Sequence, residues 1–198
     1  MATTYPQEHE VALRDGTTVH IRPLQPSDER ALADFLAGLS LRSLSFRFFS
    51  AGVSPDVAAR RAVDLRYPDS FALVAVQGDR VVGHAMYAHG RADAAEVAFA
   101  VADELQGHGI GTILLGEIST IAAANGFGTL TAEVMPENHR MLDVFADSGL
   151  PLHVRAEPGV VHVRMPSGIP LTVRRDHPGW SSGEWALASS WKPWRLIG

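Results

Sequence analysis

Residues 94–125 read A-A-E-V-A-F-A-V-A-D-E-L-Q-G-H-G-I-G-T-I-L-L-G-E-I-S-T-I-A-A-A-N, and they are followed by T-L-T-A-E-V at 129–134 and by E-N-H-R-M-L-D-V-F-A-D-S-G-L at 137–150. The apolar run at 97–101 is typical of a strand, and the glycines after it indicate a turn. The next residues repeat at the spacing of one helix face, as Ile110, Leu114, Ile118 and Ile121 show. The order strand, turn, helix, strand, helix predicts an α/β fold.

The glycine turn predicts an anion site. Glycines let the backbone approach a ligand closely, and the free N–H groups of a helix's first turn attract a group such as a pyrophosphate. A dinucleotide fingerprint needs G-x-G-x-x-G and an acidic residue about 20 positions later, whereas this turn reads G-x-G-x-G without that acid. A Walker A loop needs a lysine that is absent here. Both of these nucleotide-binding motifs are therefore disfavoured, and a different phosphorylated cofactor is expected.

At this point the sequence resembles a known family. The Q-x-x-G-x-G block at 106–111 is similar to motif A of the GNAT superfamily of acyl-CoA-dependent N-acyltransferases. A second match lies downstream, because five residues fall on the family pattern N-x-x-A-x-x-x-Y-x-x-x-G-F, namely Asn138, Met141, Phe145, Gly149 and Leu150. Two motifs in the right order are more specific than one glycine turn.

The resemblance extends over residues 10–150. The segments L-R-D-G-T-x-V-x-I-R-P-L-x-P-x-D, L-x-x-x-S-F-R-F-F and A-E-V-A-F resemble the acyltransferase domain of bacterial protein-lysine acetyltransferases that modify acyl-CoA synthetases. This resemblance implies a GNAT fold, an α/β structure with a mixed, mostly antiparallel sheet flanked by helices. It also implies acetyl-CoA as cosubstrate and an amine as acceptor.

Residues 1–166 are expected to form the GNAT acyltransferase domain, and residues 167–198 a C-terminal extension. All four tryptophans lie in that extension, at Trp180, Trp185, Trp191 and Trp194. The extension is expected to pack on its own domain, and contact with a twin subunit in a homodimer stays open because Trp is enriched at interfaces.

The remaining pattern predicts the elements that complete the sheet. Two short strands flank Asp15-Gly16, an amphipathic helix begins after Ser27, and a further helix begins at Pro55. Apolar runs at 71–76 and 81–88 predict a hairpin, and a last hairpin is expected at 152–165. The aromatic segment 40–50 is interpreted as a short helix or turn. Its phenylalanines either line an acceptor pocket or pack under the first helix.

The resemblance also implies which residues form the site. Glu96, in A-E-V-A-F, is the expected general base; the alternative is a solvated carboxylate on an edge strand. A main-chain N–H in the strand is implied as donor to the developing oxyanion. Asn138 is expected to reach the pantetheine arm, to cap the last helix, or both. The residues expected to bind the cofactor are Phe99, Ala100, Val101, Gln106, Gly107, His108, Gly109, Ile110, Gly111, Thr112 and Asn138.

One position departs from the family pattern. A tyrosine that protonates the departing thiolate is common where this chain has Phe145, and phenylalanine has no proton to give. Either the thiolate leaves unprotonated, since thiols have a pKa of about 8.5, or another group serves, with Tyr87 and His84 as alternatives.

Composition excludes several classes. The 198 residues contain no cysteine, so disulfides and a cysteine nucleophile are excluded. The net charge of −5 disfavours nucleic acid as partner. The nine histidines show no ligand spacing, so no metal is expected. No apolar stretch approaches the length of a membrane span, and neither a membrane nor a signal peptide is expected, so the expected location is cytoplasmic.

The resulting prediction is an acetyl-CoA-dependent N-acetyltransferase that acts by direct attack of a primary amine, with a protein lysine as the leading acceptor. Two alternatives remain: acetylation of a small amine or antibiotic, and a non-catalytic module that senses acyl-CoA. The sequence leaves the acceptor, the acyl chain length and the oligomeric state open.

Overall fold

The computed structural model describes residues 8–13, 15–50 and 52–168 of the chain. Within these residues, eight strands form one sheet in the order β1-β2-β3-β4-β5-β6-β8-β7, and only the β5·β6 pair is parallel. The strands are β1 His9–Ala12, β2 Thr18–Pro23, β3 Ser70–Gln77, β4 Arg80–His89, β5 Ala94–Val101, β6 Thr129–Val134, β7 His153–Glu157 and β8 Val160–Pro166. The helices are α1 Glu29–Gly38, α2 Leu41–Phe48, α3 Pro55–Val63, α4 Ile110–Ala124 and α5 His139–Asp147. The predicted α/β class with a mixed, mostly antiparallel sheet is confirmed.

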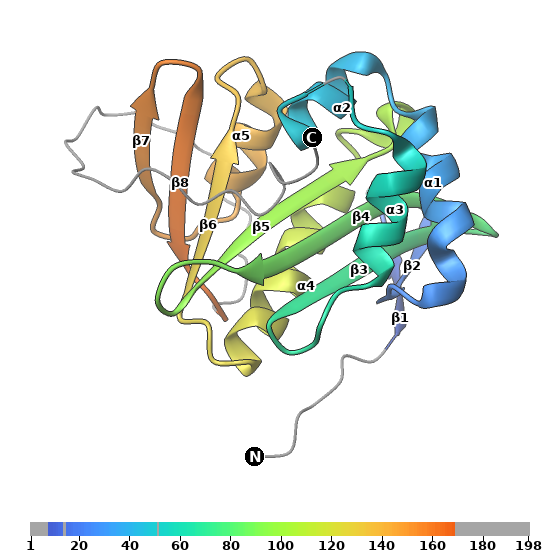
Figure 1. The fold of residues 1–198 in the computed structure, drawn as a ribbon, viewed down its shortest axis with the longest axis horizontal. Coiled ribbons are helices and arrows are strands. Elements are labelled where there is room, and N and C mark those ends of the chain that lie inside the picture. Colours follow the sequence, from blue (N-terminus) through green and yellow to red (C-terminus); the bar gives the residue numbers. More distant parts are fainter. Residues whose placement is uncertain (1–7, 14, 51, 169–198) are drawn as a thin grey trace.

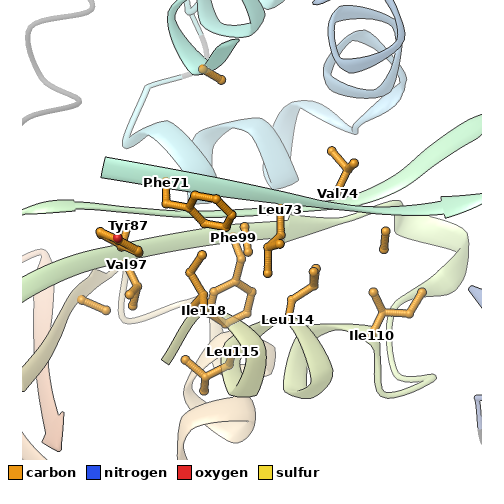
Figure 2. Close-up of a cluster of buried hydrophobic side chains, with 14 of the residues drawn as sticks. Phe71, Leu73, Val74, Tyr87, Val97, Phe99, Ile110, Leu114, Leu115 and Ile118 are labelled. Atoms are coloured by element: carbon orange, nitrogen blue, oxygen red, sulfur yellow. The ribbon is translucent and has the colours of Figure 1, made fainter. Parts of the chain in front are cut away.

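Helices cover both faces of the sheet (Figure 1). Helix α4 packs on one face, and its residues Ile110, Leu114 and Ile118 are at most 1% exposed. Figure 2 shows these side chains meeting Leu73, Val97 and Phe99 of the sheet. Helices α1, α2 and α3 lie on the opposite face (Figure 1). The helical spacing of apolar residues in 110–121 is therefore explained by burial against the sheet.

The first amphipathic helix begins slightly later than its Ser27 signal predicts. Residues Pro26–Asp28 form a 3-10 turn, and α1 follows it. Asp28 is the reason, because its carboxylate accepts from the Gln25 backbone N–H at 2.8 Å and from both terminal nitrogens of Arg22 at 2.6 and 2.8 Å. The arginine lowers the pKa of Asp28, and the ion pair ties β2 to the start of α1.

Strands β5 and β6 separate along their length. Their Cα pairs are Ala94↔Thr129, Ala95↔Leu130 and Glu96↔Thr131, and no later pair joins them in the described chain. Beyond Glu96, β5 continues beside β4 while β6 continues beside β8. The two strands diverge in Figure 1, and the separation leaves one backbone edge of β5 open.

The Trp-rich extension lies almost wholly outside the described residues. Of its residues the structure describes Ser167 and Gly168, and all four tryptophans lie outside, so the expected packing of the extension stays a prediction. In the part of the chain that is described, no helix has both the length and the apolar character that crossing a membrane requires.

Candidate functional site

The glycine turn connects β5 to α4, and its conformation requires glycine at two positions. Gly107 has φ +87° and Gly109, the N-cap of α4, has φ +96°. L-residues rarely adopt this left-handed region, so a side chain at either position would be strained. The first helical hydrogen bond runs from the Ile113 N–H to the Gly109 carbonyl at 3.1 Å. The N–H groups of residues 110–112 consequently have no acceptor within the helix and can bind an anion.

A groove of about 650 Å³ runs from this turn between α2 and α5. Nine of the twelve residues predicted for the site line it, namely Phe99, Ala100, Val101, Gln106, Gly107, Gly109, Gly111, Thr112 and Asn138. Ile110 is 1% exposed and packs in the core instead, so its side chain does not face the groove. His108 turns toward Asp15, whose carboxylate oxygen lies 3.2 Å from the imidazole Nδ1. The structure thus brings together most of the predicted cofactor-binding residues.

Glu96 lies in the interior of the sheet. Strand β5 begins at Ala94, ahead of the apolar run at 97–101, and it is flanked by β4 and β6. Glu96 is 6% exposed, so the alternative of a solvated carboxylate on an edge strand is wrong. Its Cα pairs with Thr131 in the last pair before the two strands separate. Glu96 lines neither the groove nor the small recess that adjoins it, and the recess is lined by the next residue of β5, Val97.

Asn138 caps α5 and also lines the groove. Its side-chain oxygen accepts from the Met141 N–H at 3.2 Å, which is the capping role expected of it. The residue is 8% exposed. Next to it, Arg140 donates to the Gln106 side-chain oxygen at 2.6 Å, and Gln106 in turn donates to the Val101 carbonyl at 3.1 Å. These bonds join the glycine turn to the start of α5 across the groove.

Helix α2 is bound to the end of β5 by a polar cluster that sequence reasoning missed. The Asp103 carboxylate accepts from the Ser40 N–H at 2.9 Å, from the Ser40 hydroxyl at 3.0 Å and from the Ser43 hydroxyl at 2.6 Å. Although burial opposes ionisation, these hydrogen bonds lower the pKa of Asp103 overall. The sequence around Ser40 indicates a helix N-cap. It does not indicate that Ser40 binds Asp103, which lies 63 residues later in the chain.

The aromatic segment 40–50 forms helix α2, and its phenylalanines divide between the core and the groove, so their predicted place in an acceptor pocket stays a prediction. Phe46 lines the groove, Phe49 lines the recess, and Phe48 is 6% exposed in the core. Phe49 ends α2 with φ +55°, a left-handed conformation that is rare for a bulky side chain. The segment is therefore helix α2, with one side toward the core and another toward the site.

The two alternative proton donors are not placed to serve. The Tyr87 hydroxyl donates to the Pro68 carbonyl at 2.8 Å and accepts from Asn125 at 2.9 Å, and burial raises its pKa. His84 is 2% exposed, and burial, assisted by the Arg47 charge, lowers its pKa to about 3. Neither side chain lines the groove or the recess. Departure of an unprotonated thiolate remains consistent with Phe145, which is buried and packs edge-on against Phe99.

The arrangement fits coenzyme A and its thioester. Free amides at the start of α4 suit the pyrophosphate, and the open edge of β5 presents backbone groups that can pair with the amides of a pantetheine arm. Among the described residues, no group of three His, Asp or Glu side chains is arranged to hold a metal ion.

Comparison with known proteins agrees with this geometry. Residues 39–150 match the model of the acetyltransferase (GNAT) family. The chain is 30% identical over 155 residues to the acetyltransferase Pat of Mycolicibacterium smegmatis, a match that covers 76% of this chain and 46% of that protein. It is 31% identical over 140 residues to the acetyltransferase PA5475 of Pseudomonas aeruginosa, which covers 67% of this chain and 75% of that protein.

A solved structure is similar over its whole length. The GNAT domain of S. lividans PAT superposes with a TM-score of 0.74 at 32% identity, covering 82% of this chain and 99% of that domain. The chain spans about half the length of the M. smegmatis Pat protein, so the similarity concerns the acetyltransferase part of that relative. The matched residues include the glycine turn, β5, α4 and α5, and on this evidence the chain belongs to the GNAT acetyltransferase family, whose enzymes use acetyl-CoA as cosubstrate.

Proposed function

We propose that this protein transfers an acetyl group from acetyl-CoA to the side-chain amine of a protein lysine, by direct attack and with Glu96 as general base. The observation on which this rests is the position of Glu96, a buried carboxylate at the point where β5 and β6 separate. The similarity to relatives named Pat and PAT supports a protein as acceptor.

The base is needed because the acceptor is protonated in water. A lysine amine has a pKa of about 10.4, so roughly one molecule in a few thousand has a free lone pair at pH 7. A positioned base commonly contributes about 10²–10⁴-fold in rate. Glu96 lines neither the groove nor the recess, so we expect the proton to pass from the amine to its carboxylate through water rather than by direct contact.

The other predicted residues position the cosubstrate. The amides of the glycine turn bind the pyrophosphate, and the backbone of residues 99–101 pairs with the pantetheine arm and donates to the thioester oxygen. Asn138 holds the start of α5 against the arm. Each of these roles uses groups that line the groove.

Two measurements test the proposal. Calorimetry is expected to detect binding of acetyl-CoA, and release of free thiol is expected to be faster with lysine peptides than with small amines. Faster release with small amines would move the acceptor to the small-molecule class. Binding of acetyl-CoA without thiol release in any mixture would indicate the sensing module instead.

A further inference from the structure

Helix α2 places an arginine where its pattern calls for an apolar side chain. The buried residues of this helix are Leu44, Arg47 and Phe48, at the i, i+3, i+4 spacing of one face. Arg47 is 7% exposed, and its guanidinium lies 4.7 Å from the centre of the Phe48 ring. A leucine or methionine at this position would satisfy the helix pattern at a lower desolvation cost.

Two nitrogens of the guanidinium lack hydrogen-bond acceptors among the described residues. Its Nε and Nη1 atoms are buried and have no hydrogen-bond acceptor, and no ion pair in the described chain includes Arg47. Burial lowers its pKa to about 10, so it stays a cation at neutral pH. Buried donors without acceptors are rare in folded proteins, and a buried charge without a counter-charge is costly. Such a group calls for a ligand that brings a negative or developing negative charge.

The location of Arg47 identifies which part of the ligand it meets. Helix α2 runs back along β5, since Ser40 is bonded to Asp103 after the end of the strand while Phe49 shares the recess with Val97. Arg47 lines both the groove and the recess, at the end away from the pyrophosphate turn. It therefore lies on α2 at the end of the groove nearest Glu96 of β5, where the proposed transfer takes place.

The recess is small. Its volume of about 20 Å³ admits about one atom of the size of a water oxygen. That space is closer in size to one carbonyl oxygen than to the carboxylate of a longer acyl chain, which only the wider groove could hold. The chemistry of the transfer supplies one oxygen on which negative charge develops.

We propose that Arg47 is a catalytic residue that donates hydrogen bonds to the thioester oxygen during acetyl transfer. The amine nitrogen forms a bond to the carbonyl carbon, and the π pair moves onto the oxygen, where Arg47 stabilises the charge together with a main-chain N–H of β5. Glu96 accepts the proton from the nitrogen. The electron pair then returns, the C–S bond breaks, and coenzyme A leaves as thiolate. This inference rests on the proposed acetyl transfer and adds a charged donor to it.

The experiment replaces the charged side chain of Arg47 by methionine, an uncharged side chain that is also long and unbranched. In the full chain, Arg47→Met is expected to lower kcat by about 10²–10³-fold, the usual effect of removing one such donor. The KM for acetyl-CoA should stay close to the wild-type value, and Tm should hold or rise because an unpaired buried cation is removed. Arg47→Lys keeps the charge without the planar group and should have an intermediate kcat. The matched control is Arg30→Met, on the exposed side of α1, where kcat and Tm should both be unchanged.

The outcomes separate this inference from the proposed function. If the wild type acetylates lysine peptides and Arg47→Met keeps its kcat, or fails to fold, the arginine is structural and the inference is wrong. If the wild type prefers succinyl-CoA and Arg47→Met abolishes that preference, the arginine binds an acyl carboxylate, which also overturns the inference. A wild type that turns over no acyl-CoA with any amine would refute the proposed function itself, and the inference with it.

Discussion

The two faces of strand β5 bury different kinds of residue. On one face, Val97 and Phe99 pack among the apolar side chains of α4, as Figure 2 shows. On the other face, Glu96 and Ala100 lie toward α2, where Arg47 and His84 are buried with nitrogen atoms that lack partners. The apolar face is a dry, well-packed core and stabilises the fold. The polar face costs stability, and proteins retain such features mainly where chemistry needs them.

The largest change in kcat is expected at Glu96. Its neighbour Val97, which points to the opposite face of β5, provides the comparison. Glu96→Gln should lower kcat by about 10²–10⁴-fold at neutral pH, because it removes the base, and part of the rate should return at high pH, where more of the amine is free. Val97→Ala should lower Tm through lost burial and, because Val97 lines the recess without carrying the base, should lower kcat far less than Glu96→Gln does. Thiol release measured across pH checks both. If Glu96→Gln matches the wild type at every pH, the base is another group.

The next largest effect is a loss of stability, and it is expected on the apolar face alone. Leu114 is fully buried in α4 against the sheet, so Leu114→Ala should lower the free energy of unfolding by about 2–5 kcal/mol through lost burial and a residual cavity. Chemical denaturation measures this loss. The folded variant should acetylate at the wild-type rate, and a large fall in kcat would show that the two faces are not independent.

His84, on the polar face, should make the free energy of unfolding decrease at low pH. The folded pKa of His84 is about 3, below its ordinary value of 6.5, so between these pH values the unfolded chain binds a proton that the folded chain does not. The neutral His84 therefore contributes fully to the free energy of unfolding above about pH 6.5. As the pH falls toward 3, this contribution decreases by at most about 1.4 kcal/mol per pH unit. His84→Asn should flatten this slope in denaturation curves at several pH values. An unchanged slope would assign the acid sensitivity to other groups.

The smallest effect is expected at Tyr87, whose hydroxyl lies on the α4 side of the sheet. Tyr87→Phe removes the bonds to the Pro68 carbonyl and Asn125, and should lower the free energy of unfolding by about 1–2 kcal/mol. Its kcat should equal that of the wild type. A strong fall in kcat would make Tyr87 the proton donor that the geometry excludes.

Much of the fold followed from local pattern. The strand and helix periods, the hairpin at 71–88 and the glycine turn were predicted within a few residues of the observed bounds. The glycines at 107 and 109 could be interpreted from sequence because their positive φ angles are a local requirement of the turn. The two family motifs located the groove because residues of both line it, the first in the turn before α4 and the second at the start of α5.

The rest depended on contacts between distant residues. The burial of Glu96 follows from β6 pairing beside β5, and the importance of Arg47 follows from α2 lying along β5, some 50 positions later in the chain. Helical spacing shows which residues share a face, but not what that face meets. The sequence by itself therefore determined the elements, their order and the glycine turn before α4, because these depend on near neighbours. Only the tertiary structure decided that the Glu96 carboxylate and the Arg47 guanidinium are both buried, because desolvation is a property of the assembled fold.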